Sequence, residues 1–194
     1  LAAAHAQARD AVHVALDVPA LGAQMHGEGW SCVSVASRAA SRDEYLRRPD
    51  LGRRLSAADA TQLQDLTAGD VDLAIVIGDG LSAVAAQRHA PPLLADLRAA
   101  LGDALTLAPM VIATQARVAL ADEIGALLNA RVSLILLGER PGLSSPDSLG
   151  AYLTHAPALG RVDAERNCVR NFRPEGLPPG RAAQRIAWLL REAL

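Results

Sequence analysis

The residues most suited to chemistry lie in a polar loop, 138–150, with the sequence Gly-Glu-Arg-Pro-Gly-Leu-Ser-Ser-Pro-Asp-Ser-Leu-Gly. The loop combines two turn signals with three hydroxyls and charges of both signs. It directly follows an apolar run, 132–137, which is typical of a buried strand. Because open parallel sheets bind ligands at the carboxyl ends of their strands, Glu139 is a candidate for ligand binding. The plainer interpretation is a surface ion pair between Glu139 and Arg140.

A second candidate is the turn 78–83, Gly-Asp-Gly-Leu-Ser-Ala, which fits the dinucleotide pattern G-x-G-x-x-A directly after an apolar run. Asp79 would place a negative charge where a pyrophosphate has to approach. The downstream acidic residues, Asp96 and Asp103, lie on or at the end of a predicted helix and not after a second strand. The pattern favours a strand-to-helix turn in which Asp79 or Ser82 caps the helix. A standalone nucleotide- or small-ligand-binding α/β module is the alternative function.

Nucleophilic and metal-dependent chemistry find little support in the sequence. The serines of loop 138–150 lie near His155, but no G-x-S-x-G elbow is present. The five histidines show no H-x-x-x-H spacing, and Cys32 and Cys168 belong to no C-x-x-C pair. Cys168 taken alone is typical of a small buried apolar residue. We therefore predict no catalytic residue and no metal ligand in this chain.

Composition narrows the classes of partner. Of 194 residues, 51% are apolar and 21% charged, as expected for one ordinary domain with or without a small appendage. The net charge of -2 and five dispersed aromatic residues predict no nucleic-acid partner. No apolar run approaches the roughly 18 residues of a membrane span, so we expect a soluble protein without a membrane partner. The chain begins at Leu1 inside a helical pattern, and we expect a longer N-terminus in the natural protein.

Hydrophobic patterning predicts the fold class. Apolar runs at 73–77, 105–112 and 132–137 alternate with amphipathic helical patterns. Strands that are apolar throughout and separated by helices are typical of a parallel sheet covered on both faces. We predict an α/β fold with a Rossmann-like, doubly wound, mainly parallel sheet. The loops that begin at Gly78, Ala113 and Gly138 should line one crevice.

Two parts of the chain differ in composition and in predicted secondary structure. Residues 1–70 are rich in Ala and Arg and predict a small helical N-terminal appendage, with a short helix near 57–66. Residues 30–36 alternate weakly and predict either a short strand or an extended linker. Residues 71–194 form the predicted Rossmann-like domain. Within it we expect a helix broken and restarted at Pro91-Pro92, a further strand near 150–155, and a closing helix from about Arg181.

Several segments closely resemble the small (light) subunit of adenosylcobalamin-dependent ethanolamine ammonia-lyase in sequence, order and spacing. They are LAIVIGDGLS (73–82), RVALADEIG (117–125), GERPGLSSPDSLG (138–150) and DAERNC (163–168), preceded by RRPDLGRRL (47–55). The resemblance is strong from about residue 40 onward. The GERPGL run is highly specific, whereas the GDGLS turn alone would not be.

The resemblance implies one subunit of a carbon-nitrogen lyase that converts ethanolamine to acetaldehyde and ammonia by adenosylcobalamin radical chemistry. It implies a hetero-oligomer in which a large TIM-barrel subunit binds ethanolamine, while this chain covers the cobalamin and holds no complete active site. Positions that contact cobalamin in the family correspond to Val118, Glu139 and Cys168. Ala116 departs from the family, where glycine is common. The resemblance also implies a cytoplasmic location, in some relatives within a bacterial microcompartment.

Overall fold

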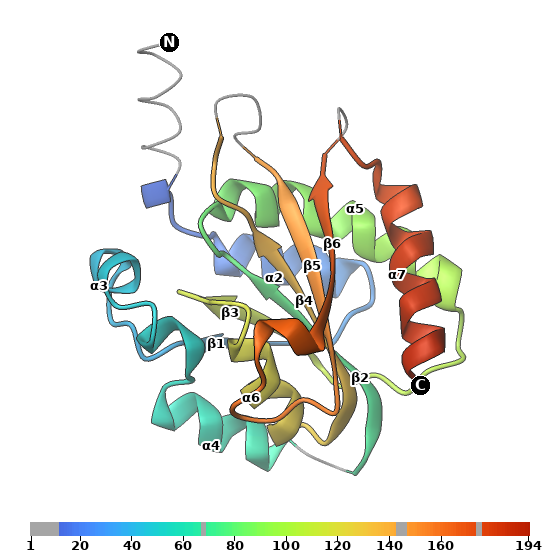
Figure 1. The fold of residues 1–194 in the computed structure, drawn as a ribbon, viewed down its shortest axis with the longest axis horizontal. Coiled ribbons are helices and arrows are strands. Elements are labelled where there is room, and N and C mark those ends of the chain that lie inside the picture. The colour runs from blue at the N-terminus through green and yellow to red at the C-terminus, as the bar shows by residue number, and fades with distance from the viewer. Residues whose placement is uncertain (1–11, 67–68, 143–146, 174–175) are drawn as a thin grey trace.

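A mixed six-stranded sheet forms the centre of the molecule in the computed structural model, which describes residues 12–66, 69–142, 147–173 and 176–194 (Figure 1). The strands are β1 (Cys32–Ala36), β2 (Val71–Gly78), β3 (Met110–Thr114), β4 (Ala130–Gly138), β5 (Leu149–His155) and β6 (Arg166–Phe172), in the order β1-β3-β2-β4-β5-β6. Pairs among β1 to β4 are parallel, whereas β4/β5 and β5/β6 are antiparallel. The predicted α/β class is confirmed. The predicted mainly parallel sheet is wrong, and its Rossmann-like, doubly wound character is not confirmed.

The chain reverses after β4 because the connection to β5 is short. A parallel crossover needs a dozen or more residues and usually a helix. Residues 139–148 are fewer than that, and their two prolines do not favour a helix. β5 therefore returns beside β4 with Leu137 opposite Gly150, and β6 pairs with β5 in turn.

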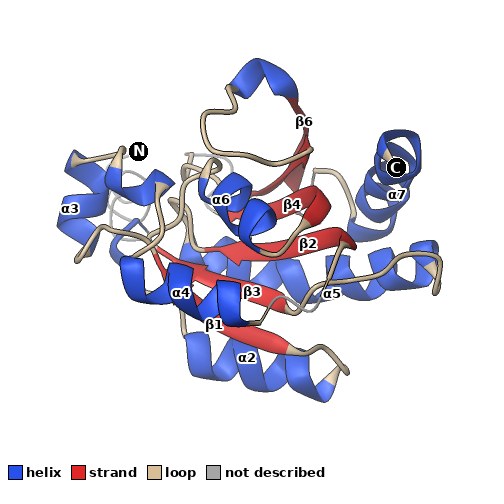
Figure 2. Ribbon diagram, turned by 90° about the horizontal axis from the view of Figure 1, so that it is seen from below, coloured by secondary structure: helices blue, strands red, loops and turns tan. Residues whose placement is uncertain are grey.

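Helices cover both faces of the sheet (Figures 1 and 2). They are α2 (Val18–Gly27), α3 (Arg42–Arg47), α4 (Ala57–Asp65), α5 (Ala83–Leu101), α6 (Leu120–Leu127) and α7 (Pro179–Ala193), with single 3-10 turns η1 (Leu51–Arg53) and η2 (Asp163–Glu165). The apolar run of β2 is continuous because its alternate residues are buried on opposite faces of the sheet. Leu73, Ile75 and Ile77 pack in the core with α2, α5 and α7, while Ala74 and Val76 pack in the core with α4 and α6. Both faces exclude water, as the run predicted.

Two helices contain prolines, and in one of them the structure departs from the sequence prediction. α5 continues through Pro91 and Pro92 without a break, so the predicted interruption is wrong. Ala90, Leu93 and Leu94 are fully buried in the core that α5 shares with the sheet and α7, and this packing offsets the hydrogen bonds that proline removes. Pro19 lies in the first turn of α2, where its missing N–H has no helical partner to lose.

The open choice at residues 30–36 resolves as a strand. β1 pairs with β3 in parallel register from Cys32 opposite Met110 to Ala36 opposite Thr114. The sheet therefore includes residues from before position 70. The predicted helices near 57–66 and from about Arg181 are confirmed as α4 and α7. The boundary between a helical N-terminal appendage, 1–70, and the rest stays a prediction.

Candidate functional site

Two cavities lie side by side where β3 and β4 end, and they share Val118 and Tyr152. The first, the Cys168 cavity, has about 290 Å³ and is lined by Val118, Tyr152, Asp163, Arg166 and Cys168. The second, the Glu139 cavity, has about 200 Å³ and is lined by Tyr45, Gly80, Leu81, Arg117, Val118, Leu137, Gly138, Glu139, Arg140, Tyr152 and Arg170. The structure thus brings Val118, Glu139 and Cys168 to one continuous surface, although 50 residues separate the first from the last in the chain.

Glu139 is held firmly at the end of β4. Its Oε2 accepts a hydrogen bond from Ser148 Oγ at 2.6 Å, and its Oε1 accepts one from Arg170 Nε at 2.5 Å. Gly150 makes room for this side chain, because a Cβ at that position would lie 2.9 Å from Glu139 Oε1. The carboxylate is only 11% exposed, yet each of its oxygens can accept a further hydrogen bond. Glu139 therefore offers a fixed, charged acceptor to a ligand.

Tyr152 connects the two cavities, and the sequence analysis did not select it. It lies opposite Cys168 in the antiparallel ladder of β5 and β6, so both side chains project from the same face of the sheet. Burial raises the pKa of Tyr152, with smaller contributions from Arg170, which lowers it, and from Glu139, which raises it. The phenol therefore stays neutral near pH 7 and can donate a hydrogen bond. Only the antiparallel register, which the sequence did not predict, places it beside Cys168.

Cys168 is exposed, which corrects the expectation that a lone cysteine is a buried apolar residue. Its strand is fixed by an ion pair between Arg166 of β6 and Asp122 of α6, in which both side chains are only 3% exposed. Burial raises the pKa of Asp122, and the hydrogen bond from Arg166 acts against that rise. This ion pair joins β6 to α6 and so determines where Cys168 lies relative to Val118.

The turn 78–83 packs too closely against β4 to receive a pyrophosphate. Gly80 adopts φ +54°, and a Cβ there would lie 2.2 Å from the carbonyl oxygen of Gly138. The N–H of Leu81 donates to this same oxygen at 2.8 Å, so an amide that could bind phosphate is already occupied. Ser82 caps α5 by accepting from the N–H of Ala85, as one of the predicted alternatives required. The contacts argue against the nucleotide-binding alternative.

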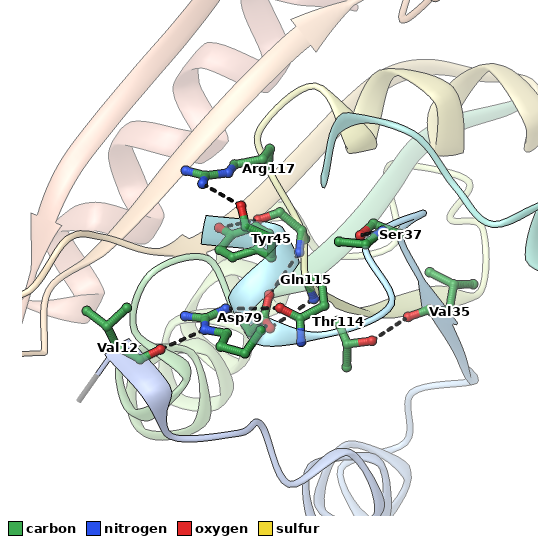
Figure 3. Close-up of polar contacts among 11 residues, drawn as sticks. Val12, Val35, Ser37, Tyr45, Asp79, Thr114, Gln115 and Arg117 are labelled. Atoms are coloured by element: carbon green, nitrogen blue, oxygen red, sulfur yellow. Dashed lines mark hydrogen bonds and ion pairs between the residues drawn. The ribbon is translucent and has the colours of Figure 1, made fainter. Parts of the chain in front are cut away.

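Asp79 instead holds the loop that follows β3. Its carboxylate accepts the backbone N–H groups of Gln115 and Ala116, each at 2.9 Å, and forms an ion pair with Arg42 at 3.4 Å (Figure 3). Burial raises the pKa of Asp79, and the two N–H groups and Arg42 oppose that rise. The hydroxyl of Tyr45 donates to the carbonyl of Ala116 at 3.0 Å. The loop leading to Val118 is therefore fixed by buried polar contacts.

The methyl group of Ala116 fits beside a glycine. Ala116 is fully buried, and its Cβ would lie 3.0 Å from a Cβ built on Gly78. Gly78 has no such atom, so the methyl group of Ala116 has room beside it. Arg117 and Val118 follow directly, and the carbonyls of both accept N–H groups from the first turn of α6.

Among the described residues, no cluster of three or more His, Cys, Asp or Glu side chains could hold a metal ion. Within the same ranges, no helix has both the length and the apolar character to cross a membrane. Ser144 and Ser145, two of the serines considered in loop 138–150, lie outside the described residues.

The fold and the site define an α/β chain with two adjoining cavities, lined largely by polar side chains, at one edge of a mixed sheet. A family model described as ethanolamine ammonia-lyase light chain matches residues 1–194. Ethanolamine ammonia-lyase small subunits from Ralstonia nicotianae and Bradyrhizobium diazoefficiens are 53% and 55% identical to it, each over 98% of this chain and over 72% and 74% of their own lengths. A third, from Pseudomonas syringae pv. tomato, is 54% identical over 98% of this chain and 68% of its own length.

The chain belongs to the ethanolamine ammonia-lyase light-chain family, as the motifs indicated.

Proposed function

We propose that this chain works in a hetero-oligomer with the large subunit of ethanolamine ammonia-lyase, where it forms one wall of the adenosylcobalamin site. The large subunit, a TIM barrel in the family, would bind ethanolamine, and the pair would convert it to acetaldehyde and ammonia. The cofactor supplies the radical chemistry, while this chain binds, orients and shields it. Family membership supports this function and a cytoplasmic location, in some relatives within a bacterial microcompartment.

The residues present fit such a cofactor. A corrin ring is large, mostly apolar and fringed with amides, so its site needs a broad apolar surface with a few fixed polar groups. Val118 and Tyr152 supply apolar surface to both cavities, and Glu139 supplies an acceptor for an amide N–H. Cys168 is exposed and lines the adjoining cavity. We assign the cofactor contacts to Val118, Glu139 and Cys168.

One observation carries the proposal. Val118, Glu139 and Cys168 are remote in the chain, yet they line two adjoining cavities that have Val118 and Tyr152 in common. Because Cys168 is exposed and Cys32 is half-buried, thiol labelling can test it directly. The complex of both subunits would be treated with a maleimide, with and without adenosylcobalamin, and each cysteine quantified by mass spectrometry. We expect the cofactor to protect Cys168 and to leave the labelling of Cys32 unchanged.

Comparing the two forms of the same complex separates protection by the cofactor from protection by the large subunit. Equal labelling of Cys168 in both forms would contradict the proposed wall. A parallel assay of acetaldehyde release, with this chain present or omitted, tests whether activity requires it.

A further inference from the structure

The Glu139 cavity carries more positive than negative charge. Three arginines, Arg117, Arg140 and Arg170, line it together with the single carboxylate of Glu139. Glu139 is already paired with Arg170 at 2.5 Å. Among the described residues, no carboxylate lies within ion-pair distance of Arg117 or Arg140. The chain as a whole has a net charge of -2, so this positive cavity is a local feature.

Arg117 is the most rigidly placed of these cations. Its guanidinium lies over the ring of Tyr45, 4.1 Å from the centroid, and its Nη2 donates to the backbone carbonyl of Tyr45 at 3.2 Å (Figure 3). Its backbone N–H donates to the carbonyl of Gly52 at 2.9 Å. A Cβ at Gly52 would lie 2.8 Å from Arg117 Cγ, so the segment packs tightly on the aliphatic stem.

The fixed side chain has an unused donor. Arg117 Nε is buried and has no hydrogen-bond partner in the structure. A buried N–H without an acceptor is costly, and native proteins rarely leave one unpaired. A guanidinium that is pre-positioned and lacks a counter-charge is suited to an oxyanion with several acceptor oxygens, above all a phosphate group.

We infer that Arg117, assisted by Arg140, binds the phosphodiester of the cofactor's nucleotide tail. This inference rests on the proposed function, since it takes adenosylcobalamin as the ligand. The amide side chains of the corrin ring are neutral, and the phosphodiester is the cofactor's anionic group. Val118, which follows Arg117 directly, lines both cavities, so the corrin and its tail would meet this chain at neighbouring positions.

The test compares two corrinoids on the complex of both subunits. Adenosylcobalamin has the phosphodiester, and adenosylcobinamide lacks the phosphate together with the nucleotide. Dissociation constants would be measured by absorption titration for the wild type, Arg117→Gln and Arg117→Lys. Arg98→Gln is a matched control, because Arg98 also lies over an aromatic ring, that of Trp30 at 3.6 Å, but lines neither cavity.

We expect Arg117→Gln to weaken adenosylcobalamin binding by about 10- to 100-fold, as the loss of a charged hydrogen bond implies, and to leave adenosylcobinamide binding unchanged. Arg117→Lys should lose less, and Arg98→Gln should change neither constant. Equal loss for both corrinoids, or no loss for either, would overturn the inference while the proposed function stands. A wild-type complex that binds neither corrinoid would overturn the proposed function as well.

The alternative ligand for Arg117 is a carboxylate of the large subunit, bound in place of the cofactor phosphodiester. If Arg117→Gln weakened subunit association without any corrinoid present, the arginine would serve the interface and the phosphodiester assignment would be wrong. Adenosylcobinamide phosphate is a third corrinoid for this comparison, because it has the phosphate but not the base. We expect Arg117→Gln to weaken its binding, as it does that of adenosylcobalamin.

Discussion

Replacing Glu139 by alanine should weaken cofactor binding by roughly 10- to 150-fold. The carboxylate is 11% exposed and is fixed by Ser148 at 2.6 Å and Arg170 at 2.5 Å, so it needs no reorganisation to accept a ligand N–H. A hydrogen bond to a charged group contributes about 1.5–3 kcal/mol, which corresponds to that change in the dissociation constant. Glu139→Gln retains one acceptor oxygen and should lose less.

The assay is an absorption titration of the two-subunit complex with adenosylcobalamin. Asp72→Ala is the matched control, because Asp72 also binds an arginine, Arg131 at 3.1 Å, and a hydroxyl, Thr106 Oγ1 at 2.8 Å. It lies at the start of β2 and lines neither cavity. An unchanged dissociation constant for Glu139→Ala, or an equal loss for Asp72→Ala, would refute the reasoning.

Three further changes test the framework, each by urea unfolding followed by circular dichroism. Asp79→Asn should lower the free energy of unfolding by about 1–3 kcal/mol, because the amide cannot accept both backbone N–H groups that the carboxylate accepts. Burial raises the pKa of Asp79, so the fold favours the protonated side chain, and wild-type stability should fall as pH rises from the ordinary aspartate pKa through the folded-state pKa, a change that Asp79→Asn lacks. The difference of about 1–3 kcal/mol applies above that range, where Asp79 is a carboxylate, and it should be larger at lower pH. Gly80→Ala should cost roughly 2–4 kcal/mol, since its Cβ would overlap the oxygen of Gly138, and an effect below about 1 kcal/mol would contradict that geometry. Arg166→Met should cost about 3–5 kcal/mol by leaving Asp122 buried without its partner, and a neutral result would show that Asp122 is not charged in the fold.

The central strands could be predicted because burial on both faces leaves a plain signature. Residues 73–77 and 132–137 are apolar at every position except Ser133, and both runs lie inside β2 and β4. The helix after Gly78 was also predicted, but its continuity through Pro91 and Pro92 was not. Local propensity counts only the lost hydrogen bonds, whereas packing of α5 against α7 decides the outcome.

The sequence of β6 has almost no hydrophobic pattern from which a strand could be predicted. Its sequence, RNCVRNF, buries only Val169 and Phe172, because it is an edge strand with one face open. The antiparallel pairing of β4, β5 and β6 was therefore missed, although segment 139–148 is shorter than a parallel crossover usually requires. The partners of Glu139 and Cys168, namely Arg170 and Tyr152, depend on that register and were therefore missed.

The candidate site was reached from the sequence by two routes. Strand patterning alone placed Glu139 at a carboxyl end, and the structure bears out that position. Val118 and Cys168 came only from the family resemblance, because an isolated valine and an isolated cysteine have no chemical pattern. Arg117 was visible within the RVALADEIG segment, but its unpaired Nε becomes apparent only in the packed structure.

The most direct test of the cofactor wall is a structure of the two-subunit complex with adenosylcobalamin bound. We predict corrin atoms within about 4 Å of Val118, Glu139 and Cys168, with the nucleotide phosphate beside Arg117. A complex in which these four residues face solvent, far from the tetrapyrrole, would contradict the account.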